Sequence, residues 1–295
     1  MIISASRRTD IPAFFMRWFM SRVRAGSVSV VNPFNAAQRR EVSLAPADVD
    51  AIVFWTRDAR NLLPHIDELE NRGLRFFVQL TLTGYPKALE PKAPPVESAV
   101  ATVRRLSERI GKSRVIWRYD PILLTNLTPP EFHRRNFATL AAALDGAVDT
   151  VTLSIADDYR KSVRNLKRVP GLTVPDTAEA AQLLGRSGLM EAITDEAAHR
   201  SLGVVSCAEP LLAAVPGITP RGCIDAGYLR REYGLTDIPG KDRNQRRECL
   251  CVASVDIGAY DTCAFDCAYC YAVSSPEAAA LRRKRHSAEG AALID

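Results

Sequence analysis

Short apolar runs that read as strands alternate with helix-like segments along nearly all of this 295-residue chain. The apolar runs are rich in Val, Ile, Leu and Phe, and Gly, Pro or charged residues bound them. This alternation predicts an α/β fold with a parallel sheet and crossover helices. Seven main strands are expected, near the eight of a closed βα barrel of the TIM type. They are Ile2–Ser6, Ala51–Thr56, Arg75–Thr83, Arg114–Asp120, Thr150–Ile155, Gly203–Cys207 and Cys251–Gly258.

Helix signals fall between these strands. The first helix begins at Asp10 and ends at Gly26, and the last begins with Ser275 as N-cap before Pro276. Thr128 opens a capping box that predicts the start of another helix. Further helices are expected at 61–71, 96–110, 161–168, 178–184 and 189–201, a hairpin at 27–44, and irregular chain at 208–248.

No linker or low-complexity run divides the chain, so we expect one domain over residues 1–295. A net charge of +5 permits an anionic partner without requiring one. There is no long apolar run to span a membrane, and the N-terminal residues lack the pattern of a secretory signal, so a cytoplasmic protein is expected. In that compartment seven cysteines indicate metal or redox chemistry in place of structural disulfides.

Polar residues follow the predicted strands, where the reactive groups of parallel βα barrels gather. Arg118 stands in an otherwise apolar strand and is costly to bury unless Asp120 or a ligand carboxylate pairs with it. We predict Arg118, Tyr119 and Asp120 as catalytic residues. The alternative is a plain ion pair from Arg118 to Asp120 or Glu209 without a ligand. The other polar strand-end residues are Ser4, Ser6, Arg7, Arg8, Thr9, Asp10, Trp55, Thr56, Gln79, Thr81, Thr83, Ser154, Asp157, Asp158, Cys207 and Glu209.

Cys263, Cys267 and Cys270 form a C-x3-C-x2-C loop within residues 261–271, between the last strand and the last helix. No fourth cysteine or histidine lies close by in the sequence. Structural zinc sites close their shell with a fourth ligand, whereas iron–sulfur clusters are held by thiolates. Three thiolates alone therefore indicate a metal centre with an open position.

The other four cysteines, Cys207, Cys223, Cys249 and Cys251, fall within one segment, residues 207–251. Four thiolates make a complete shell for a four-iron cluster or for a structural zinc. The alternative is a scatter of buried cysteines without a metal. We expect this segment to bind an auxiliary cluster.

The histidines His65, His133, His199 and His286 all fall on predicted helices without a common spacing, so we interpret them as structural or surface residues. The basic run Arg282–His286 is expected to be a solvated helix face. Contact with nucleic-acid phosphates is its alternative interpretation.

The C-x3-C-x2-C spacing, with Tyr269 before the third cysteine, resembles the signature of radical S-adenosylmethionine (radical SAM) enzymes. The resemblance implies a [4Fe–4S] cluster on Cys263, Cys267 and Cys270, whose fourth iron is chelated by the amino and carboxylate groups of S-adenosylmethionine. The reduced cluster then yields methionine and a 5′-deoxyadenosyl radical that abstracts hydrogen from a substrate. Tyr269 would pack beside the adenine, and an external reductant such as flavodoxin or ferredoxin would supply electrons.

The chain also resembles a narrower bacterial family, the domain of unknown function 1848, over essentially its full length. That family carries no established reaction. The resemblance rests on Ser4–Pro12, Asn32–Phe34, Phe54–Thr56, Leu80–Tyr85, Trp117–Pro121, Cys207–Glu209, Gly222–Asp225 and Asp256–Tyr260.

The cysteine loop of most radical SAM enzymes follows the first strand, but here only 25 residues follow Cys270. We therefore predict a circularly permuted barrel or partial barrel, in which the strand at Ile2–Ser6 lies beside the strand at Cys251–Gly258. This mapping implies that S-adenosylmethionine contacts come from Ser4, Arg7, Arg8, Thr81, Thr83, Ser154 and Tyr269.

The leading hypothesis is thus a radical SAM enzyme with a catalytic and an auxiliary [4Fe–4S] cluster, acting on an unknown polar substrate. The second cysteine set resembles the auxiliary clusters of such enzymes, and full ligation favours electron relay or a structural role. One rival is a non-enzymatic zinc or iron–sulfur protein that binds nucleic acid through a basic face. The other is a barrel hydrolase with structural cysteines.

Overall fold

The computed structural model describes residues 1–294. Its main feature is an eight-stranded sheet in which all neighbouring strands are parallel. This confirms the predicted α/β fold. The strand order runs from β10 to β9 without pairing between these two edge strands, so within the described residues the sheet is open. In spatial order the strands are β10 (Val255–Asp256), β1 (Ile2–Ala5), β4 (Ala51–Thr56), β5 (Phe76–Thr81), β6 (Val115–Ile122), β7 (Thr150–Ile155), β8 (Gly203–Ser206) and β9 (Ile218–Pro220).

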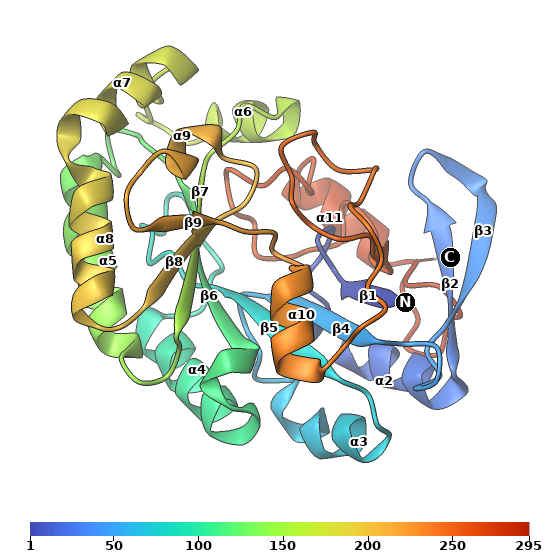
Figure 1. Ribbon diagram of the computed structural model, residues 1–295. Helices are drawn as coiled ribbons and strands as arrows, with labels where there is room; N and C mark the ends of the chain where they lie inside the picture. The colour runs from blue at the N-terminus through green and yellow to red at the C-terminus, as the bar shows by residue number, and fades with distance from the viewer. Residues whose placement is uncertain (295) are drawn as a thin grey trace.

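The two ends of the chain meet in this sheet. β1 and β10 are parallel neighbours, with Ile3 opposite Val255 and Ser4 opposite Asp256. In Figure 1 the start of the chain, in dark blue, lies against the orange and red C-terminal part. The predicted adjacency of the first and last strands is confirmed, although β10 is shorter than the predicted strand Cys251–Gly258.

The helices follow the predicted alternation. Asp10 caps the first helix by accepting a hydrogen bond from the Ala13 amide at 2.9 Å, and Ser275 caps the last in the same way through Ala278. The first helical segment is interrupted at Phe15. The helices are α1 (Ile11–Phe14), α2 (Met16–Ala25), α3 (Ile66–Asn71), α4 (Val96–Ile110), α5 (Pro130–Leu144), α6 (Arg160–Leu166), α7 (Thr177–Ser187), α8 (Leu189–His199), α9 (Pro210–Ala213), α10 (Ala226–Tyr233) and α11 (Pro276–Arg283), with short 3₁₀ turns η1 (Leu63–His65) and η2 (Lys112–Arg114).

Two further predictions concern the segments outside the sheet. β2 (Ser27–Asn32) and β3 (Asn35–Ser43) form the expected antiparallel hairpin. No helix among the described residues is long and apolar enough to cross a membrane.

Two local predictions were wrong. Residues 208–248 are not irregular throughout, because they contain α9, β9 and α10, and β9 supplies the eighth strand. Thr128 does not cap α5. Its hydroxyl donates to the Leu123 carbonyl at 2.6 Å, and Pro129 occupies the cap position instead.

The sheet has two different faces. On one face, side chains such as Phe54 and Trp117 pack against the helices in the main core. On the other face, a second apolar cluster joins the sheet to α10 and to the segment around Cys251. The rings of Phe77 and Tyr228 lie 4.8 Å apart there, and Figure 1 shows α10 in front of β4 and β5. The segment between β9 and β10, which includes α10, thus covers this second face of the sheet.

Candidate metal centres and active site

The C-x3-C-x2-C loop follows β10 at the carboxyl end of that strand, the edge where parallel βα folds carry their chemistry. Burial raises the pKa of all three thiols, that of Cys267 to about 12. The loop therefore holds protonated thiols unless a metal replaces the protons. Within residues 1–294, the thiols of Cys263, Cys267 and Cys270 do not form a group as tight as one ion requires. Three thiolates on one loop are a donor set that fits an iron–sulfur cluster.

A buried ion pair lies beside this loop. The Arg57 guanidinium is 2.9 Å from the Glu90 carboxylate and contacts the Tyr269 hydroxyl, which also donates to Glu90. Thr83 donates to the same carboxylate. Burial lowers the pKa of Arg57, but the nearby Cys267 and Glu90 raise it by more, so the net pKa is well above its ordinary value. Arg57 is thus a permanent cation beside the cysteine loop.

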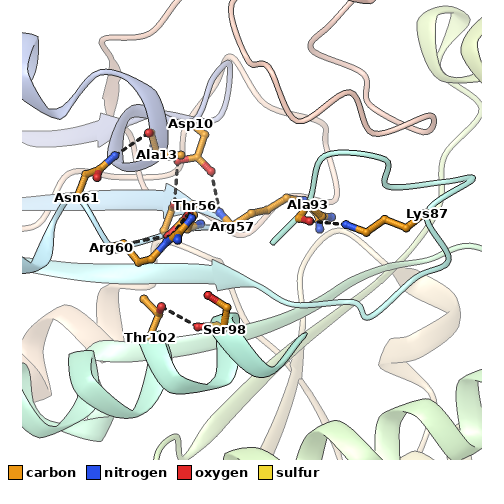
Figure 2. A network of polar contacts seen from close by, with 11 residues as sticks. Asp10, Ala13, Thr56, Arg57, Arg60, Asn61, Lys87, Ala93, Ser98 and Thr102 are labelled. Carbon is orange, nitrogen blue, oxygen red and sulfur yellow. Dashed lines mark hydrogen bonds and ion pairs between the residues drawn. The ribbon is translucent and has the colours of Figure 1, made fainter. Parts of the chain in front are cut away.

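Asp10 joins the start of α1 to the end of β4, as Figure 2 shows. Its carboxylate accepts hydrogen bonds from the Thr56 hydroxyl and the Arg57 amide, both at 2.7 Å. Burial raises its pKa to about 7. In the same view Asn61 donates to the Ala13 carbonyl at 2.8 Å and fastens α1 from the other side. The backbone at Arg57 and the side chain of Asn61 are therefore both hydrogen-bonded to the segment from Asp10 to Ala13.

The N-terminal segment binds Asp256 of β10. This carboxylate accepts hydrogen bonds from the Ser4 hydroxyl at 2.8 Å, the Ser6 hydroxyl at 2.7 Å and the Arg7 amide at 2.8 Å. Ser4 also accepts a hydrogen bond from the Trp55 indole at 3.1 Å. The Ser4 hydroxyl, predicted to contact the cofactor, therefore joins β1 to β10.

Arg7 and Arg8 point in different directions. The Arg7 guanidinium lies 4.8 Å from the centre of the Trp55 ring and donates to Ser254. Burial lowers the pKa of Arg7, but the nearby Cys251 and Cys223 of the second cysteine set raise it by more, so the net pKa is raised. The Arg8 guanidinium lies 5.3 Å from the Tyr260 ring and 3.9 Å from Asp256, beside the cysteine loop.

The predicted catalytic residues are divided between the two faces of β6. Arg118 pairs with Asp120, and Ser154 of β7 donates to the same carboxylate. Tyr119 points to the opposite face, where its hydroxyl contacts His133 at 2.9 Å. Asn136 donates to that hydroxyl at 3.0 Å. The structure therefore brings Arg118, Asp120 and Ser154 together and leaves Tyr119 in the core against α5. Thr81 is half-buried on β5, in register with Arg118.

Three of the four cysteines in the second set, Cys207, Cys249 and Cys251, meet in space. The Cys207 sulfur lies 3.8 Å from that of Cys249 and 3.9 Å from that of Cys251. These three sulfurs form a group that can hold a metal ion. Cys223 lies beside them and accepts a hydrogen bond from Arg118 at 3.1 Å.

A cavity of about 400 Å³ opens at the ends of β6, β7 and β8. Its wall includes Tyr269, Asp157 and Glu209, beside many apolar side chains. Burial raises the pKa of Glu209 to about 7, and its Oε1 atom is buried without a partner among the described residues. This volume lies in the range of small-molecule sites.

Two residues of this region were not predicted from the sequence. Arg57 directly follows the strand that ends at Thr56, so its position as a polar strand-end residue could have identified it. Glu90 lies in the loop before α4, where no pattern marks it.

The model of the family described as domain of unknown function (DUF1848) matches residues 2–272. The chain belongs to this family. No curated protein matches the chain. The DUF1848 match covers the eight-stranded sheet and both cysteine sets, so the candidate site residues are part of the family domain, whereas α11 lies outside it.

Proposed function

We propose that this DUF1848 chain is a radical SAM enzyme with a [4Fe–4S] cluster on Cys263, Cys267 and Cys270. The observation that carries the proposal is the parallel pairing of β1 with β10. It puts an open three-cysteine loop at the carboxyl edge of a parallel sheet, beside the N-terminal segment. A circular permutation of the superfamily's βα order accounts for this arrangement, with the cluster-bearing unit last in the chain.

When bound, the reduced cluster supplies the electron that cleaves S-adenosylmethionine to methionine and a 5′-deoxyadenosyl radical; flavodoxin or ferredoxin would be its reductant. Cations near the loop offset the charge of the thiolates. Arg57 lies near Cys267, and Lys161 lies 3.6 Å from Asp261 at the start of the loop. Among Arg8, Arg57 and Lys161, Arg8 has the longest ion pair, at 3.9 Å from Asp256. Because its present partner is the most distant, Arg8 is the best candidate to bind the cofactor's carboxylate.

The cavity at the ends of β6–β8 is the proposed site for substrate and for the adenosyl part of the cofactor. Tyr269 belongs both to the cysteine loop and to the cavity wall. The ion pair of Arg118 and Asp120 on β6 does not line this cavity, and in this proposal it orients a polar substrate from the neighbouring part of the strand. Ser154 holds Asp120 in position.

The contacts of the basic run do not favour the rival function, nucleic-acid binding. Within Arg282–His286, the Arg283 guanidinium lies 4.8 Å from the Phe14 ring. The His286 ring lies 4.8 Å from Phe15, and its Nδ1 contacts the Leu293 carbonyl at 2.8 Å. These two half-buried side chains therefore pack the end of α11 against Phe14 and Phe15, whereas Lys284 and Arg285 are exposed.

Electron paramagnetic resonance of the anaerobically reconstituted and reduced protein tests the proposal. The spectrum of the cluster should change when S-adenosylmethionine is added, because the cofactor ligates the open iron. The triple variant Cys263→Ala, Cys267→Ala, Cys270→Ala should lose this signal. A cluster spectrum that S-adenosylmethionine leaves unchanged would contradict the proposal.

A further inference from the structure

The four cysteines of residues 207–251 lie on the face of the sheet that α10 covers, and three of them form a tight group. The Cys207 sulfur is 3.8 Å from the Cys249 sulfur and 3.9 Å from the Cys251 sulfur, and the three lie within 4.8 Å of one another. A tetrahedral ion that binds thiolates at about 2.3 Å holds them about 3.8 Å apart. A four-iron cluster places each thiolate on a different iron, which separates the sulfurs further.

Cys223 is the candidate for the fourth ligand. It lies next to the three sulfurs but outside the group within 4.8 Å of one another, and the amide of the next residue, Ile224, donates to the Cys251 sulfur at 3.5 Å. Such N–H to sulfur bonds typically support metal-bound thiolates. Gly222 allows this approach, because a Cβ there would lie 2.6 Å from the Leu250 carbonyl oxygen.

Two cations border the four sulfurs. Arg118 donates to the Cys223 sulfur at 3.1 Å, and both Arg118 and Arg7 pack on the Trp55 ring, at 5.1 and 4.8 Å. The Arg7 Nη2 atom is buried without a partner among residues 1–294. A divalent ion with four thiolates carries a net charge of −2. Arg7 and Arg118 offset part of this charge, although Arg118 also pairs with Asp120.

We propose that Cys207, Cys223, Cys249 and Cys251 bind a single tetrahedral zinc ion, in place of the auxiliary [4Fe–4S] cluster expected from the sequence. Tetrahedral all-sulfur sites suit zinc, and a closed four-ligand shell makes the site structural. The ion ties the end of β8 to the segment between β9 and β10, and so fixes the covering of the sheet face. It also fixes Cys223, whose sulfur accepts the hydrogen bond from Arg118.

Metal analysis of the purified protein tests this independently of any radical chemistry. After treatment with EDTA, about one zinc per chain should remain, and X-ray absorption should show four sulfur ligands at about 2.3 Å. The triple variant of Cys263, Cys267 and Cys270 to Ala should keep the zinc. Cys249→Ala should lose it, and Cys223→Ser should weaken its retention at least tenfold.

A measurement on the unmodified chain avoids the risk that a cysteine variant fails to fold. Exchange with Co²⁺ should give the visible absorption of a tetrahedral cobalt thiolate, and added zinc should abolish it. Iron with sulfide retained by the triple variant would overturn the proposal in favour of an auxiliary cluster. A single iron without sulfide would overturn the assignment to zinc, and metal-free protein with disulfides among these cysteines would overturn the site itself.

Discussion

The Ser4 hydroxyl donates to the Asp256 carboxylate at 2.8 Å, across 252 residues of sequence. The same carboxylate accepts hydrogen bonds from the Ser6 hydroxyl and from the Arg7 and Gly258 amides. One side chain therefore joins the first strand of the chain to the strand that carries the cysteine loop.

Asp256→Asn should destabilise this junction. One carboxylate oxygen becomes an amide group that cannot accept from the donors facing it, so the free energy of unfolding should fall by about 2–3 kcal/mol. Unfolding in guanidinium chloride measures this free energy, with the exposed Asp195→Asn on α8 as control. Equal unfolding free energies of the two variants would show that Asp256 does not hold the strands together.

Glu90→Gln should destabilise the region beneath the cysteine loop. Loss of the Glu90 carboxylate, 2.9 Å from the Arg57 guanidinium, leaves a buried charge without a partner. The free energy of unfolding should fall by about 3 kcal/mol. The double variant Arg57→Met, Glu90→Gln should recover part of this loss, because the uncompensated charge is gone. Thermal unfolding of the variants, with the exposed Glu97→Gln as control, measures the energetic coupling between Arg57 and Glu90. If the stability losses of the single variants add up in the double variant, the two residues are not coupled.

His133 should make stability depend on pH. Burial lowers its pKa to about 4, whereas an unfolded histidine titrates near pH 6.5. Between these values the unfolded chain binds a proton that the folded chain does not. Stability should therefore fall as the pH drops from about 6.5 to 4, by up to about 3 kcal/mol.

His133→Gln should reduce this pH dependence, although it also lowers the overall stability. Urea unfolding across the pH range measures the slope, and His199→Gln at the exposed end of α8 should keep the wild-type slope. A His133→Gln variant with that same slope would show that another group is responsible.

Gly222→Ala should loosen the second cysteine set, because the added Cβ would lie 2.6 Å from the Leu250 carbonyl oxygen. Backbone must shift, and overpacking of this kind costs about 1–3 kcal/mol. Bound metal should be released to a chelator at least tenfold faster. Gly240→Ala in the same segment has open space around it and should release metal at the wild-type rate. Equal release from both variants would refute the close approach of the two backbones.

The sequence predicts much of this fold because strand and helix periodicities are local. The runs at Ala51–Thr56 and Thr150–Ile155 became strands with the predicted bounds, and Val96–Ile110 became the predicted helix. β9 was missed because it is three residues long and ends at Pro220. α10 was missed although Asp225 caps it, because its eight residues give too short an apolar pattern.

The candidate site was less predictable, since it depends on contacts between distant segments. Tyr119 was grouped with Arg118 and Asp120 by sequence position, but the two-residue period of a strand puts it on the opposite face. The sequence marked Ser4 as a cofactor contact, and only the structure shows that its hydroxyl binds Asp256. The pairing of Glu90 with Arg57 likewise depends on tertiary structure.

Formation of 5′-deoxyadenosine tests the central claim most directly. The reconstituted protein, reduced anaerobically and given S-adenosylmethionine, should produce 5′-deoxyadenosine and methionine, measured by liquid chromatography and mass spectrometry. Cys267→Ala should produce neither, whereas Cys249→Ala should retain cleavage per bound cluster if it remains folded. A protein that holds a full [4Fe–4S] cluster on Cys263, Cys267 and Cys270 but leaves S-adenosylmethionine intact would contradict the account.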